Sequence, residues 1–133
     1  MRKSRNLAEA PKRLTDVELE LMTIVWRLGE ASVADVIAQL PPGRELAYTS
    51  VSTMLRILES KGVVGTRKEG RGHIYLPLLD KAEYEASAVR DVVDRVFQGV
   101  PVAMVRQLLD NVKLSDAELR EVRKLLSRPK GRK

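Results

Sequence analysis

The 133-residue sequence predicts a mainly α fold that contains one small β-hairpin. Apolar residues recur at helical spacing along most of the chain, and two of these runs begin with a Thr or Ser followed three residues later by Glu, which is a helix-capping pattern. One region differs, because two short β-type runs flank a glycine-containing turn. Three helices come before this turn, and three helices followed by a hairpin are the order of elements in a winged helix-turn-helix domain.

The first two helices have clear start and stop signals. Residues 15–18 (Thr-Asp-Val-Glu) form a capping box, in which the Thr hydroxyl and the Glu carboxylate satisfy each other's backbone amides. Gly29 ends the apolar run that follows. Ser32 is placed to cap a second helix, and residues 41–43 (Pro-Pro-Gly) end it.

A third helix and a hairpin follow. Thr49 is placed to cap a helix over residues 49–61, and Gly62 closes that helix. Residues 63–68 and 73–77 have the composition of strands, with a hairpin tip at 69–72 whose glycines accept positive φ.

The remainder is predicted to be helical. A long helix opens near Asp80 and runs to about Phe97, a shorter one covers roughly 102–111, and residues 115–118 form a capping box for a last helix ending near Leu126. We therefore expect a basic N-terminal arm (1–13), a winged-helix domain (14–79), a helical arm (80–126) and a basic tail (127–133).

The third helix has two different faces. One face is apolar, and the opposite face carries hydroxyls and one arginine. An ordinary solvated helix face usually holds more Glu and Lys, since Ser and Thr are mediocre helix formers. Short hydroxyl side chains can approach base edges in the major groove, and an arginine can bind a guanine or a phosphate. The predicted DNA contacts of this helix are Thr49, Ser50, Ser52, Thr53 and Arg56.

The hairpin is basic. Arg67, Lys68 and Arg71 cluster around its tip, with His73 directly behind them. Such a wing can bind phosphates or enter the minor groove, although basic turns also serve simply as solubilising surface. The formal charge of +6 favours a polyanionic partner in the same way. The lone histidine is expected to contact phosphate rather than a metal ion.

Composition excludes several function classes. The chain has no cysteine, which removes disulfides, thiolate metal sites and cysteine nucleophiles. No phosphate-binding loop, nucleophile turn or dinucleotide fingerprint is present, so we expect neither an enzyme nor a cofactor. No secretory signal or membrane-length apolar run is found, and a cytoplasmic location is expected.

The helical arm carries more apolar side chains than fewer than fifty residues can bury by themselves. An intramolecular cap on the winged helix is one explanation, and a two-fold interface with a second copy is the other. The two-fold interface is favoured, because two winged-helix domains on one palindromic site double the contacts to DNA. The predicted dimerisation residues are Val89, Val93, Phe97, Val105, Leu108, Leu109, Leu119 and Val122.

One ordered set of residues carries a family resemblance. These residues are Leu14-Thr15-Asp16-Val17-Glu18, Met22, Trp26, Val33, Val36, the run from Tyr48 to Leu58, Lys61-Gly62, Gly70-Arg71, Tyr75 and Pro77. Through them the sequence resembles the penicillinase-repressor (BlaI/MecI/CopY) family of winged-helix regulators. The resemblance spans about residues 14–126, and its most specific part is the third helix through Lys61-Gly62.

The resemblance implies a homodimeric transcriptional repressor that binds double-stranded operator DNA at an inverted repeat. In members that control β-lactam resistance, a membrane sensor protease triggers cleavage at an Asn-Phe pair in the arm; the corresponding pair here is Gln107-Leu108. The copper-responsive branch binds metal through C-terminal cysteines, which this chain lacks. The alternative is a winged-helix module that docks an acidic protein, although its third helix lacks the exposed apolar or acidic anchors of such a surface.

Overall fold

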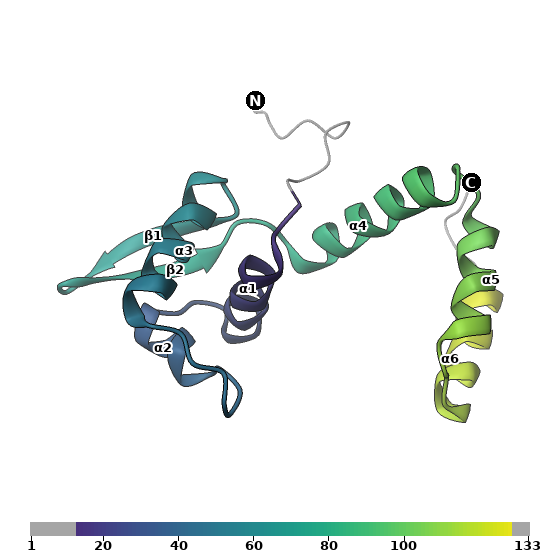
Figure 1. Ribbon diagram of the computed structural model, residues 1–133, viewed down its shortest axis with the longest axis horizontal. Coiled ribbons are helices and arrows are strands. Elements are labelled where there is room, and N and C mark those ends of the chain that lie inside the picture. The colour runs from purple at the N-terminus through teal and green to yellow at the C-terminus, as the bar shows by residue number, and fades with distance from the viewer. Residues whose placement is uncertain (1–12, 129–133) are drawn as a thin grey trace. The chain divides into compact units, whose positions relative to one another are not determined.

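The computed structural model describes residues 13–128, and it confirms the mainly helical fold with a single hairpin in that part of the chain (Figure 1). The expected N-terminal arm and most of the basic tail lie outside the described residues. The elements in chain order are α1 (Asp16–Leu28), α2 (Val33–Ala38), α3 (Tyr48–Ser60), β1 (Val64–Glu69), β2 (Gly72–Pro77), α4 (Lys81–Val96), α5 (Pro101–Asn111) and α6 (Asp116–Ser127).

Reciprocal capping starts three of the helices. Thr15 and Glu18 form the predicted box at α1, and Ser115 and Glu118 form the predicted box at α6. Ser32 caps α2 as expected, and Asp35 completes that box. Each box satisfies backbone amides that a helix start otherwise leaves without partners, so the sequence signal and the structure agree at these positions.

Two helix ends differ from the prediction. The N-cap of α3 is Ala47, with an extended backbone and no side-chain bond to the helix, and α3 already begins at Tyr48. Thr49 is therefore inside the first turn, and the prediction that it caps α3 was wrong, because the cap must precede the first helical residue. Helix α2 ends at Ala38 and not near Leu40, although Leu40 still packs against the core.

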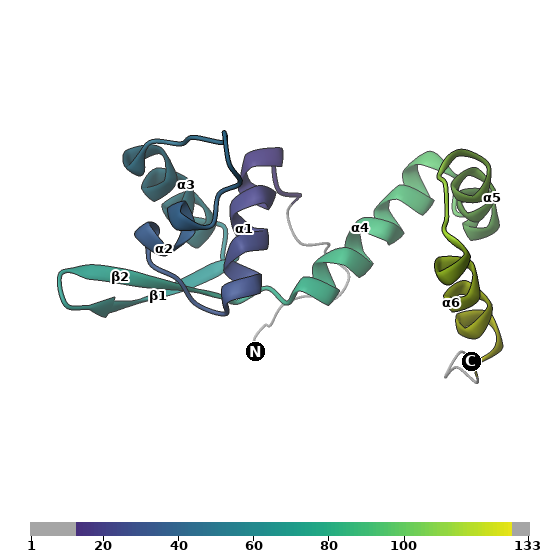
Figure 2. The ribbon, with the colours of Figure 1, turned by 90° about the horizontal axis from the view of Figure 1, so that it is seen from below.

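The hairpin is a regular antiparallel pair in which Val64 lies opposite Pro77 and Glu69 lies opposite Gly72. Gly70 and Arg71 are the two residues of its loop, and Gly70 has a φ of 59°, which favours glycine in a tight two-residue turn. Ala31 forms an isolated bridge to Tyr75 and so ties the segment between α1 and α2 to the sheet. Figures 1 and 2 show the tip of the hairpin projecting beyond α1, α2 and α3.

The core is formed by aliphatic residues from all three helices and the hairpin. Its fully buried large side chains are Leu21, Met22, Val25, Val36, Val51, Leu55, Leu58 and Val64. Their spacing on α1 and α3 is the helical periodicity read from the sequence. The core therefore fixes which side of α3 faces inward and which side faces away.

Contacts divide the described chain into two compact units, residues 13–89 and 90–128. The first half of α4 belongs to the first unit, since Tyr84 and Ser87 are buried there. The tyrosine ring lies 6.0 Å from that of Trp26, whose indole N–H donates to the Leu79 carbonyl at 2.8 Å. The functional domains expected at 14–79 and 80–126 stay a prediction.

Candidate nucleic-acid interface

Helix α3 presents a polar face to its surroundings. Val51, Leu55 and Leu58 are fully buried on its inner side. Opposite them, the structure brings most of the predicted contact residues together as exposed side chains, with one of them half-buried. The exposed ones are Thr49, Ser50, Thr53 and Arg56, and the half-buried one is Ser52.

The register of the hairpin separates the basic residues of the wing. Lys68 lies opposite His73 and therefore on the same sheet face. Alternation along the strand places Thr66 on that face too, and its hydroxyl donates to Glu59 of α3 at 3.0 Å. Lys68 and His73 thus lie on the face of the hairpin that is turned toward α3.

Arg67 lies on the other face of the hairpin. Its guanidinium donates to Glu30 at 2.7 Å and contacts Glu69 at 3.4 Å. These carboxylates hold the pKa of Arg67 above its ordinary value, and the guanidinium holds the pKa of Glu30 below its own. Arg67 therefore already has two anionic partners within the protein, unlike what its position in a basic cluster suggested.

A groove of about 400 Å³ lies between α3 and the hairpin, and the start of α2 also lines it through Ser32, Val33 and Ala34. Tyr48, Ser52 and Arg56 line it from α3, while Arg71 and His73 line it from the hairpin. The floor includes Tyr75. Burial raises the pKa of the Tyr75 phenol and Glu59 raises it further, whereas the nearby guanidinium of Arg56 lowers it. The hydroxyl, guanidinium and imidazole groups of these lining residues make the groove rich in hydrogen-bond donors.

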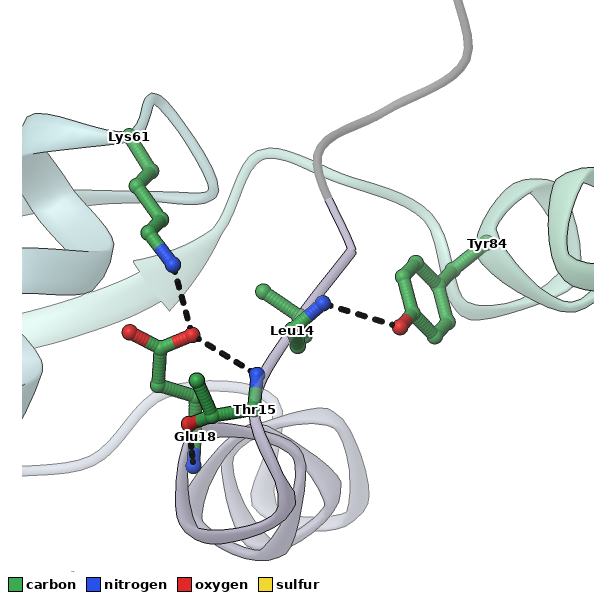
Figure 3. A network of polar contacts seen from close by, with 5 residues as sticks. All are labelled: Leu14, Thr15, Glu18, Lys61 and Tyr84. Atoms are coloured by element: carbon green, nitrogen blue, oxygen red, sulfur yellow. Dashed lines mark hydrogen bonds and ion pairs between the residues drawn. The ribbon is translucent and has the colours of Figure 1, made fainter.

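A buried polar network holds the end of α3 against the start of α1 (Figure 3). The Lys61 ammonium donates to Glu18 Oε1 at 2.7 Å, and the same oxygen accepts from the Thr15 backbone amide at 3.0 Å. The neighbouring Leu14 amide donates to the Tyr84 hydroxyl at 3.1 Å. No sequence pattern predicts the ion pair between Glu18 and Lys61, because these two residues are far apart in the chain.

The Glu18 carboxylate remains ionised despite its burial. Burial by itself raises the pKa of Glu18, but the hydrogen bond and charge of Lys61, together with the Thr15 amide and hydroxyl, hold that pKa below its ordinary value. The side chain of Glu18 is 5% exposed and that of Lys61 is 22% exposed. This pair therefore fixes α3, and with it the polar face, relative to α1.

The second unit has an exposed apolar surface. Helices α5 and α6 have no buried residue in the described chain. The predicted dimerisation residues of this unit are exposed or half-buried. Val105, Leu108 and Leu109 are exposed, whereas Val93, Phe97, Leu119 and Val122 are half-buried. Val89, which is also exposed, is the last residue of the first unit.

Between residues 13 and 128, no group of three or more His, Asp or Glu side chains is placed to hold a metal ion. Within the same residues, no helix is long and apolar enough to cross a bilayer.

Comparison with known proteins places the chain. A family profile described as "Penicillinase repressor" matches residues 14–128, which is most of the sequence. The chain belongs to the penicillinase repressor family. The penicillinase repressor of Bacillus licheniformis is 31% identical over 121 residues, covering 91% of this chain and 94% of that protein. The methicillin resistance regulatory protein MecI of Staphylococcus aureus is 21% identical over 115 residues, covering 86% and 94% of the two chains.

Solved structures include a solution structure of monomeric Bacillus licheniformis BlaI in complex with the blaP half-operator. It is 31% identical, with a TM-score of 0.47, and covers 56% of this chain and 90% of that one. Membership in the penicillinase repressor family makes the chain a winged-helix DNA-binding transcriptional repressor rather than an enzyme. This confirms the family resemblance and the general function predicted from the sequence.

Proposed function

We propose that this repressor acts as a homodimer on an inverted-repeat operator, with α3 of each subunit in the major groove of one half-site. The exposed polar face of α3 supports this proposal, because its short side chains leave the helix backbone free to approach base edges closely. The residues assigned to the DNA interface of α3 are Thr49, Ser50, Ser52, Thr53 and Arg56.

The hairpin is proposed to bind the DNA backbone beside α3. Lys68 and His73 share the face turned toward α3, and Arg71 is at the projecting tip. Contacts to phosphate add affinity without sequence preference and make binding sensitive to salt. Of the predicted hairpin residues, Arg67 is the least suited to bind phosphate, since it would first have to give up its ion pairs with Glu30 and Glu69.

The observation that carries the homodimer is the exposed apolar surface of α5 and α6. Val105, Leu108 and Leu109 of α5 are 44%, 42% and 51% exposed, and neither α5 nor α6 buries a side chain in the described chain. Apolar helices gain most of their stability from packing, so two such helices favour a partner that covers them. A second copy supplies an identical surface, which a two-fold axis makes self-complementary.

The test is sedimentation of the full chain and two variants. Leu109→Asp places an ionised carboxylate in the proposed interface, and we expect a monomer with an intact helical signal, since desolvating an unpaired charge is costly. Arg106→Gln lowers the charge of α5 by the same one unit at an exposed position outside the groove that Phe97 and Leu108 line, and we expect a dimer. A wild-type monomer, or a Leu109→Asp variant that remains a dimer, contradicts the proposal.

A sensor protease is a further proposed partner, acting at the Gln107-Leu108 bond. Both residues are exposed, and their peptide bond lies within α5, where the Asn111 side chain donates to the Gln107 carbonyl at 2.9 Å. Cleavage there would detach α6 and its apolar side chains from the rest of the chain, which provides a physical route to loss of the dimer. Incubating the purified chain with the sensor protease and measuring the fragment masses by mass spectrometry tests whether this bond is the one cut.

A further inference from the structure

We propose that the groove between α3 and the hairpin receives one backbone phosphate of the operator, so that Arg56 is a phosphate contact and not a base contact. This inference rests on the proposed function and goes beyond it, because it assigns different tasks to two rows of residues on α3. One row binds backbone, and the other reads sequence.

The two rows follow from helical spacing. Tyr48, Ser52 and Arg56 are four residues apart and therefore form one row along α3. All three line the groove, so this row is on the flank of α3 that faces the hairpin. Thr49 and Thr53 form the next row, farther from the core and exposed. When a helix enters the major groove, its outermost row meets base edges and its flanks meet the phosphate walls.

The hairpin completes a set of donors around the groove. Arg71 supplies a guanidinium and His73 an imidazole opposite the Arg56 guanidinium and the Tyr48 and Ser52 hydroxyls. Two guanidiniums bring charge and directed N–H groups, which are well suited to phosphate oxygens. Arg56 and the buried Tyr75 line this groove together, so Arg56 lies on the hairpin side of α3.

One carboxylate also lines the groove. Glu69 lies beside it, and Arg67, two residues earlier on the same strand, contacts this carboxylate at 3.4 Å. The pairing offsets the negative charge of Glu69, so that Arg56 and Arg71 dominate the local charge.

The experiment neutralises the phosphates of the DNA one at a time. The probe is a duplex recovered by selection from a random-sequence library with the wild-type chain, and each of its phosphates is replaced in turn by a methylphosphonate. We expect one position to cost wild type on the order of tenfold in affinity, as for a lost charge-assisted hydrogen bond. A methylphosphonate at that same position should change the affinity of Arg56→Gln and of Arg71→Gln very little, because each variant already lacks the side chain that binds this phosphate.

The control variant is Arg27→Gln, which removes one positive charge from the exposed end of α1, outside the groove. We expect Arg27→Gln to lose as much affinity as wild type when the phosphate at that position is replaced by a methylphosphonate. In a second series each guanine is replaced by 7-deazaguanine, which lacks the N7 acceptor. If 7-deazaguanine at one position lowers the affinity of wild type but not that of Arg56→Gln, then Arg56 reads that base, and the inference is overturned.

The remaining outcomes separate the two claims. One outcome is that Arg56→Gln and Arg71→Gln abolish the methylphosphonate effect on affinity at two different phosphates, or at none. In either case the two residues do not share one phosphate in the groove, while operator binding stands. If selection enriches no sequence, operator binding itself fails and the inference fails with it.

Discussion

Replacing Lys61 tests the link between α1 and α3, the helix proposed to contact DNA. In Lys61→Met the long side chain still packs, but the Glu18 carboxylate keeps its burial and loses its cation. Removing one partner of a buried ion pair costs about 3–5 kcal/mol, because the other charge is left uncompensated. Since the Lys61 side chain is 22% exposed, water replaces part of its interaction, and we expect a loss of about 2 kcal/mol at pH 7.

The pH dependence of stability gives the sharper signature. In wild type the pKa of Glu18 is lower in the folded than in the unfolded chain. Its stabilising contribution is therefore present above the unfolded pKa of about 4.3 and is lost as the pH falls through the folded value. In Lys61→Met burial dominates and raises the folded pKa. The contribution of Glu18 then changes sign, and the folded state gains stability as the pH falls toward the unfolded value.

The assay is urea unfolding over a pH series, followed by the fluorescence of Trp26. This is the chain's single tryptophan, and it is hydrogen-bonded to Leu79 within the first unit. Glu18→Gln is the matched control, since an amide oxygen can still accept the Thr15 bond while the charge is absent. Its stability should depend less on acid than that of wild type. Equal stability and an equal pH slope for wild type and Lys61→Met would refute the reasoning.

Three further predictions concern single contacts. Thr53→Ala should lower affinity for the selected duplex by about 1 kcal/mol, with the loss confined to particular base pairs in a substitution series; a loss that is uniform over all sequences contradicts base contact. Replacing Lys68 and Arg71 together by Gln should flatten the slope of log affinity against log salt by about two units, and an unchanged slope means that the hairpin does not touch DNA. Tyr84→Phe should cost about 1 kcal/mol in urea unfolding through loss of the bond from Leu14, and an unchanged midpoint rules that contribution out.

Elements with strong local chemistry were predictable from the sequence. The boxes at Thr15 and Ser115 are complete within four residues, so their helix starts could be located before any tertiary contact was known. The start of α3 could not be located in this way. Ala47 provides no side-chain cap, and the choice between Thr49 and an earlier start depends on the packing of Val51 and Leu55 against the core.

The candidate site was predictable as a set of residues but not as an arrangement. Helical periodicity placed Thr49 and Thr53 on the outer face, because that argument depends only on α3 itself. The separation of Lys68 from Arg67 requires the strand register, and the pairing of Arg67 with Glu30 requires the fold. Long-range ion pairs leave no periodic signal in one sequence, and for the same reason the bond between Glu18 and Lys61 was not predicted.

Two copies of this repressor are proposed to place two α3 helices on one inverted repeat. The direct measurement is the affinity of wild type and Leu109→Asp for a full inverted repeat and for one isolated half-site, at equal salt. We predict that wild type binds the full site far more tightly than the half-site, whereas Leu109→Asp binds both alike and matches wild type on the half-site. Equal affinity of wild type for full and half-sites, or an unchanged full-site affinity in Leu109→Asp, would contradict binding as a dimer through this surface.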